Sequence, residues 1–221
     1  EVYTRTGKPL YITLDTGHQT GQRKFLRPSE SQILSIIKDH TQFGGFRDNR
    51  TVWLGPNSCY ELVEECTRDL SAVEKYIEKI MREMDAHPHL FAEEQDGAPY
   101  RWIEKLGCYS PIIHLQQTEE SSSSHNPFTP MHNSTGIISG EKVLESLAVS
   151  YHNQCDSEMP PRCADIYLTL EIFFGTSSFN RDIIRDLECS VEYWRKFIPK
   201  DGLPLNELVA DGQLSAAQGQ R

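Results

Sequence analysis

Two carboxylates and one imidazole stand at the ends of, or within, three short runs that have the pattern of β-strands. Asp15 ends the run Leu-Tyr-Ile-Thr-Leu-Asp, and Glu171 ends the similar run Tyr-Leu-Thr-Leu-Glu. His114 lies within a third run, Pro111 to Gln117. Two carboxylates and an imidazole around one point suit a divalent metal ion (Mn²⁺, Co²⁺, Mg²⁺ or Zn²⁺) and leave positions for substrate oxygens. The alternative is a pair of acids that cap neighbouring helices and a buried, hydrogen-bonded histidine.

Further polar residues follow the first and third runs. His18 comes three residues after Asp15 in Asp-Thr-Gly-His, where Gly17 permits a turn that brings the imidazole back over the strand end. We expect His18 to contact the substrate or the metal ligands, and a solvated loop histidine is the alternative. Gln116 and Gln117 follow the histidine of the third run, and amides are good partners for the hydroxyls of a sugar substrate.

Two loops hold the remaining candidates for substrate binding. His125 lies in a polar loop, 118–130, that contains four consecutive serines, and it could swing over the site. Arg23 and Lys24 lie on the loop after the first strand and could bind a substrate phosphate or carboxylate. An idle surface histidine and a solvated basic pair are the alternatives for these residues.

The elements that must position these residues alternate along the chain. Apolar alternation predicts strands at 10–15, 111–117 and 165–173. Capping patterns and apolar spacing predict helices from Ser29, from Ser58 over about seven turns, from Ser139 and from Asn180. Such an order implies an α/β fold with parallel strands, as an open doubly wound sheet or a (β/α)8 barrel, with the active site at the carboxyl ends of the strands. No glycine-rich phosphate loop follows a strand, which weakens the nucleotide-binding version.

Composition limits the function classes. The 221 residues fit one domain, and the formal charge of −10 argues against nucleic acid or an anionic membrane as the main partner. No apolar run reaches the roughly 20 residues that span a bilayer, and the N-terminus lacks a signal-peptide pattern. The six cysteines form no C-x-x-C pair and have the pattern of reduced thiols. We therefore expect a cytoplasmic protein that acts on a small polar molecule.

The three runs resemble motifs of the xylose-isomerase-like (β/α)8 barrel superfamily, which includes sugar isomerases, sugar epimerases, hydroxypyruvate isomerase and endonuclease IV. The resemblance rests on Leu14-Asp15-Thr-Gly-His18, Ile113-His114-Leu115-Gln116 and Leu170-Glu171. It implies a TIM barrel of which this chain supplies strands six to eight and lacks the N-terminal strands, in keeping with a first residue that is Glu1. Residues 1–200 would be the C-terminal part of one domain, with a long helical insertion at about 29–96, and 201–221 a flexible tail.

The same resemblance implies a metal site. Members hold one divalent metal ion through a Glu, an Asp, a His and a second Glu at successive strand ends. The last three map onto Asp15, His114 and Glu171, and the first Glu would belong to a strand before Leu10. The histidine of the first motif maps onto His18, which the resemblance places in the catalytic machinery with Glu171.

The implied activity is that of a metal-dependent sugar or sugar-phosphate isomerase or epimerase, in which an enediolate forms and Glu171 moves a proton at the adjacent carbon. Decarboxylation of a keto sugar acid on the same scaffold is one alternative. A non-catalytic half-barrel that binds a partner or a sugar is another. Expected partners are a small sugar, sugar phosphate or sugar acid and, because open strand edges associate, a second copy of the chain.

Overall fold

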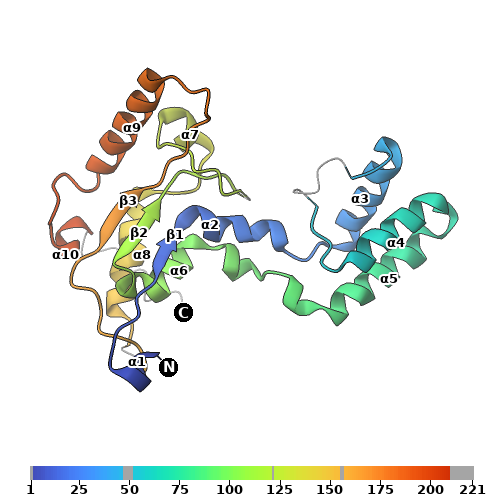
Figure 1. Cartoon of the computed structure of the whole chain (residues 1–221), viewed down its shortest axis with the longest axis horizontal. Helices are drawn as coiled ribbons and strands as arrows, with labels where there is room; N and C mark the ends of the chain where they lie inside the picture. The colour runs from blue at the N-terminus through green and yellow to red at the C-terminus, as the bar shows by residue number, and fades with distance from the viewer. Residues whose placement is uncertain (1, 47–51, 121, 155–156, 210–221) are drawn as a thin grey trace. The chain divides into compact units, whose positions relative to one another are not determined.

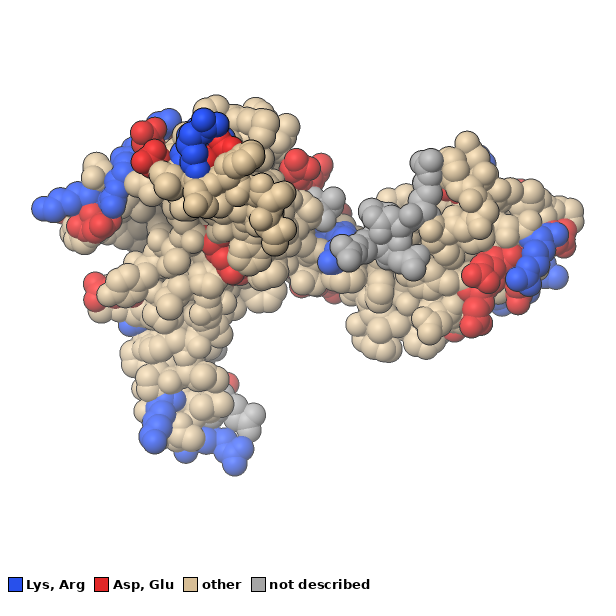
Figure 2. Space-filling model, turned by 45° about the horizontal axis from the view of Figure 1, so that its top comes forward, with Lys and Arg blue, Asp and Glu red and all other residues tan. Residues whose placement is uncertain are grey.

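The computed structural model describes residues 2–46, 52–120, 122–154 and 157–209, and its chain forms two compact units (Figure 1). The first unit comprises Glu1–Gly21 and Ala98–Arg221, and the second comprises Gln22–Gly97. None of the helices in the described residues is long and apolar enough to span a membrane. On the face drawn in Figure 2, the Lys and Arg side chains of the described residues lie in small, separate groups.

A three-stranded parallel sheet organises the first unit. The strands are β1 (Thr13–Asp15), β2 (Ile112–Leu115) and β3 (Tyr167–Leu170), in the order β1-β2-β3. The prediction of an α/β fold with parallel strands is thus confirmed. The described strands form an open sheet, so the barrel itself stays a prediction.

Strand pairing brings the carboxyl ends of all three strands to one edge. Asp15 lies opposite His114, and His114 lies opposite Thr169, so that Glu171 stands two residues further along the third strand. Because alternate residues of a strand share a face, Asp15, His114 and Glu171 all belong to the same face of the sheet.

Helices cover the other face of this sheet. The helices of the first unit are α1 (Val2–Thr6), α2 (Thr16–Thr20), α6 (Pro99–Leu106), α7 (Pro130–Thr135), α8 (Gly140–His152), α9 (Asn180–Arg195) and α10 (Leu205–Leu208). A 3-10 turn at Gly107–Tyr109 precedes β2, and another at Gly21–Phe25 follows α2.

The core of the first unit lies between the covered face and these helices. Leu14, Ile113 and Leu115 are at most 2% exposed and belong to one cluster with Ile103, Val143, Leu147 and Trp194 of α6, α8 and α9. Full burial of such a side chain stabilises the fold by roughly 1.5–3 kcal/mol. The opposite face is open, since Ile112 is 39% and Tyr167 67% exposed.

The second unit is helical. Its helices are α3 (Glu30–Phe43), α4 (Asn57–Arg68) and α5 (Val73–Ala86), with 3-10 turns at Leu70–Ala72, Pro88–Leu90 and Glu94–Gly97. Its core consists of side chains that are 0–1% exposed, including Ile33, Ile37, Val63, Ile80 and Met84. The capping box predicted at Ser29 is present, since its hydroxyl accepts from the backbone N–H of Gln32, whose side chain accepts from the backbone N–H of Ser29.

The prediction of one seven-turn helix from Ser58 is wrong. The helix ends at Arg68, because the Asp69 side chain accepts hydrogen bonds from the backbone N–H and hydroxyl of Ser71, at 3.2 and 2.6 Å, which compete with helical bonding. Ser58 is also not the N-cap residue, since α4 begins after Pro56. Its hydroxyl donates instead to Glu83 Oε1 of α5, at 2.8 Å.

Two further predictions about the last elements need correction. Asn180 is the first residue of α9 rather than its cap, a position that Phe179 takes. Within the predicted flexible tail, Leu205–Leu208 form α10, and Val209 is 4% exposed in a cluster with Leu144 and Ala148 of α8. Burial of these apolar side chains fixes the start of the tail, and residues 210–221 lie outside the described part of the chain.

Candidate metal centre

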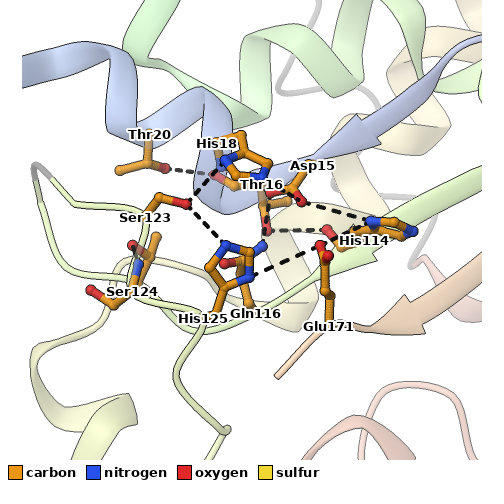
Figure 3. A network of polar contacts seen from close by, with 11 residues as sticks. Asp15, Thr16, His18, Thr20, His114, Gln116, Ser123, Ser124, His125 and Glu171 are labelled. Carbon is orange, nitrogen blue, oxygen red and sulfur yellow. Dashed lines mark hydrogen bonds and ion pairs between the residues drawn. The ribbon is translucent and has the colours of Figure 1, made fainter. Parts of the chain in front are cut away.

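Asp15, His114 and Glu171 converge at the carboxyl edge of the sheet, on its open face (Figure 3). Nδ1 of His114 lies 2.9 Å from Oε2 of Glu171 and 3.7 Å from Oδ2 of Asp15. One ligand atom from each residue lies within 4.8 Å of the other two. Metal–ligand bonds of about 2.0–2.2 Å place neighbouring ligand atoms about 2.8–3.6 Å apart. The three side chains could therefore hold a divalent ion.

Glu171 carries an oxygen whose hydrogen-bonding capacity is unused. Its backbone N–H donates to the carbonyl of Leu115 at 2.9 Å, which continues the ladder one residue past β3 and fixes the position of the residue. Its Oε2 is buried and accepts no hydrogen bond from the residues that the structure describes, because the close contact with His114 Nδ1 lacks hydrogen-bond geometry. A buried carboxylate oxygen without a donor is costly, and a cation at this point would satisfy it.

Hydrogen bonds from the protein reach one oxygen of the Asp15 carboxylate, Oδ1. Its Oδ1 accepts the backbone N–H of His18 and the side-chain N–H of Gln116, both at 2.8 Å, and its side chain is 12% exposed. Through the first bond Asp15 is the N-cap of α2. The helix-capping role that was the alternative to metal binding is therefore present, and it leaves Oδ2 directed at His114.

A second layer of side chains connects the two ends of the cluster. The His18 ring is 66% exposed, with Nε2 3.8 Å from Asp15 Oδ2 and Nδ1 3.3 Å from the hydroxyl of Ser123. The same hydroxyl lies 3.3 Å from Nε2 of His125, whose Nδ1 lies 4.0 Å from Glu171 Oε2. Figure 3 shows this chain of contacts from α2 through the serine loop to the end of β3.

The His125 side chain is packed against its neighbours, whereas the sequence suggested a loop residue that could move over the site. It is 5% exposed, and its ring stacks on Phe173 with centroids 4.0 Å apart. Its backbone has φ of 49°, a left-handed conformation that costs on the order of 1–3 kcal/mol in a residue other than glycine. Paired hydrogen bonds between Gln117 and Asn126 hold the loop that carries it. These contacts hold the His125 ring beside Glu171.

The side chains of the two predicted glutamines are buried and hydrogen-bonded to protein atoms. Gln116 is 0% exposed and donates to Asp15, and Gln117 is 2% exposed and donates to Asn133 Oδ1 and to the carbonyl of Ile138. A buried amide already engaged with protein atoms cannot reach a sugar hydroxyl without rearrangement. Their role in binding a substrate stays a prediction, and it would require such a rearrangement.

Arg23 and Lys24 belong to the second unit. The Arg23 Nε donates to the carbonyl of Gly97 at 2.8 Å, and the Lys24 ammonium lies 4.8 Å from the centre of the Phe25 ring. Their role in binding a substrate anion stays a prediction.

Ser123 and Phe173 are the residues of the site that sequence reasoning missed. The run of four serines indicated a functional loop but not which serine would lie between two imidazoles. Phe173 lies two residues after Glu171, in the phase of the same face, and this spacing was the available signal.

Comparison with known proteins gives one distant relative. No protein-family model matches the chain. The chain is 28% identical over 141 residues to a protein named D-erythrulose 1-phosphate 3-epimerase from Brucella abortus (strain 2308). The match covers 63% of this chain and 41% of that protein, so the chain spans about two fifths of the length of its relative. This similarity supports an enzyme of the sugar isomerase or epimerase kind.

Proposed function

We propose that the protein is a divalent-metal-dependent epimerase or isomerase of a small ketose phosphate. The observation that carries this proposal is the convergence of Asp15, His114 and Glu171 at the carboxyl edge of a parallel sheet, with a buried carboxylate oxygen that accepts no hydrogen bond from the described residues. The similarity to a protein named as a sugar-phosphate epimerase supports the substrate class.

The reaction requires movement of a proton at the carbon next to the carbonyl group. A bound divalent ion supplies positive charge that stabilises the negative charge developing on the substrate oxygens. Glu171 is the base, since a carboxylate that holds the ion through one oxygen keeps the other for the proton. His18, with its ring 66% exposed beside Asp15, orients a substrate oxygen through its N–H.

The fold that suits this function is a (β/α)8 barrel, of which the three strands form one arc. The covered face of the sheet would then be the outer, helix-packed face, and the open face with Asp15, His114 and Glu171 would line the interior. The second unit, between β1 and α6 in the sequence, would be an insertion into this barrel.

Metal-binding calorimetry with Mn²⁺ and Co²⁺ tests the site. We expect Asp15→Asn and Glu171→Gln each to weaken binding at least tenfold, about 1.4 kcal/mol. Asp165→Asn is the matched control, because this exposed carboxylate lies near the amino end of β3. Equal effects in all three variants, or no binding by the unmodified chain, would refute the site.

Proton movement is tested in D₂O with a four-carbon ketose 1-phosphate as the probe. We expect the unmodified, metal-loaded protein to exchange the proton next to the carbonyl for deuterium, as followed by NMR, and Glu171→Gln to abolish the exchange. Metal binding without exchange would leave the metal site standing and overturn the epimerase or isomerase activity.

A further inference from the structure

Two adjacent glutamines after β2 have the same burial and different partners. Gln117 uses its whole amide within the protein: Nε2 donates to Asn133 Oδ1 at 2.9 Å and to the carbonyl of Ile138 at 3.0 Å, and Oε1 accepts the backbone N–H of Ile138 at 2.9 Å. Since burial of an amide is offset only by such hydrogen bonds, Gln117 is explained by the stability of the fold.

Gln116 is not explained in that way. Its side-chain hydrogen bond runs from Nε2 to Asp15 Oδ1, at 2.8 Å, while its Oε1 is buried and has no hydrogen-bond partner in the described part of the chain. An unsatisfied buried acceptor destabilises the fold. The same amide donates a hydrogen bond to one oxygen of Asp15, as Figure 3 shows.

This donor determines how the Asp15 carboxylate is presented. Together with the backbone N–H of His18 it holds Oδ1 at two points, so that Oδ2 faces His114, 3.7 Å away. An amide is neutral, so it orients the carboxylate without pairing its charge, whereas a Lys or Arg would compete with a cation for that charge.

Gly17 leaves space for the amide. A Cβ at this position would lie 2.3 Å from Oε1, 2.4 Å from Cδ and 2.9 Å from Nε2 of Gln116, closer than real contacts allow. Gly17 lies within α2 and has no left-handed φ, so its backbone does not require glycine, and the turn predicted from the sequence is not the reason for it. A Cβ on Gly136 would overlap Gln117 in the same way, with its nearest atoms 2.1–2.4 Å away.

From these contacts we infer that Gln116 is a positioning residue, which orients Asp15 for a divalent cation. The lack of a side chain at Gly17 leaves room for the Gln116 amide in this position. This inference rests on the proposed function, because it takes Asp15 to be a metal ligand. It assigns Gln116 to the support of the metal site rather than to the substrate.

Gln116→Met and Gln117→Met form a matched pair for the test. Methionine keeps the length and unbranched shape of glutamine and removes the donor. Co²⁺ affinity of the 221-residue chain is measured by calorimetry, the ligand arrangement by the visible absorption of bound Co²⁺, and stability by urea unfolding. We expect both variants to lose stability, but only Gln116→Met to weaken Co²⁺ binding tenfold or more and to alter its absorption spectrum.

Gly17→Ala is a second variant that keeps Gln116 itself, with Gly136→Ala as its control. We expect Gly17→Ala to reproduce the loss of affinity and the spectral change, and Gly136→Ala to leave both within twofold of the unmodified protein. If the unmodified chain binds Co²⁺ and Gln116→Met and Gly17→Ala bind it as tightly, with the same spectrum, the positioning role is wrong and the metal site stands. If the unmodified chain binds no Co²⁺, both proposals are wrong.

Discussion

Removal of the Tyr100 hydroxyl should change how the stability of the protein depends on alkaline pH. Tyr100, in α6, donates to the carbonyl of Ile137 and accepts the backbone N–H of Ser139, both at 2.7 Å, and so connects α6 to the segment before α8. Burial, with Tyr193 nearby, raises the pKa of Tyr100 from 10.0 to about 12. Tyr100→Phe removes both the hydrogen bonds and this ionisation.

The magnitude follows from these contacts. At neutral pH, loss of the hydroxyl leaves a carbonyl and an N–H without their partner, which destabilises the protein by about 1–3 kcal/mol. Between the pKa of 10.0 in the unfolded chain and about 12 in the folded protein, only the unfolded chain loses the proton. Stability therefore falls as pH rises through this window, by about 1.4 kcal/mol per pH unit and about 2.7 kcal/mol in all, and Tyr100→Phe lacks this loss.

Urea unfolding, followed by circular dichroism at several pH values from neutral to about 12, measures this difference. We expect the unmodified protein to be the more stable at neutral pH and its advantage to shrink above about pH 10. Tyr167→Phe, at a position that is 67% exposed, is the control and should follow the unmodified protein throughout. An advantage that stays constant up to pH 12 would refute the reasoning.

Two further predictions concern the second unit and the cysteines. Met84→Ala, at a position that is 0% exposed, should lower the free energy of urea unfolding by about 2–5 kcal/mol. The control Glu74→Ala, at an exposed position of the same helix, should lower it by less than about 0.5 kcal/mol. Equal losses would contradict the assigned core. Burial, with Glu83 nearby, raises the pKa of Cys59 to about 11. In a Cys155→Ser variant at neutral pH, a thiol reagent should therefore label the half-buried Cys189 before Cys59. Comparable labelling of Cys59 in the folded protein would contradict its burial.

The sequence allowed the parallel strands and the three convergent residues to be predicted, for a simple reason. Strand alternation fixes the face of each side chain, and parallel pairing fixes the shared edge, so Asp15, His114 and Glu171 could be placed together before their distances were known. The capping box at Ser29 is equally local and was predicted for the same reason.

What sequence reasoning misplaced depends on tertiary contacts. The buried Gln116 and Gln117 side chains lie against Gly17 and Gly136, and no local pattern in the sequence reports such tertiary contacts. The break at Asp69 arises from a side-chain hydrogen bond that competes with the helix while the apolar spacing continues through it. The packing of His125 against Phe173 is likewise set by the fold of a loop.

The two glycines opposite Gln116 and Gln117 have a consequence for folding specificity. Consecutive residues of an extended segment point to opposite sides, so each glycine admits the amide from its own side only. Displacement of this segment by one residue, in the direction that brings the apolar Leu115 to the place of Gln116 beside Asp15, would also move the His114 imidazole into the hydrophobic core position of Leu115. This mismatch of polar and apolar side chains disfavours a misaligned sheet, so the same residues that surround the candidate metal site also favour the native strand alignment.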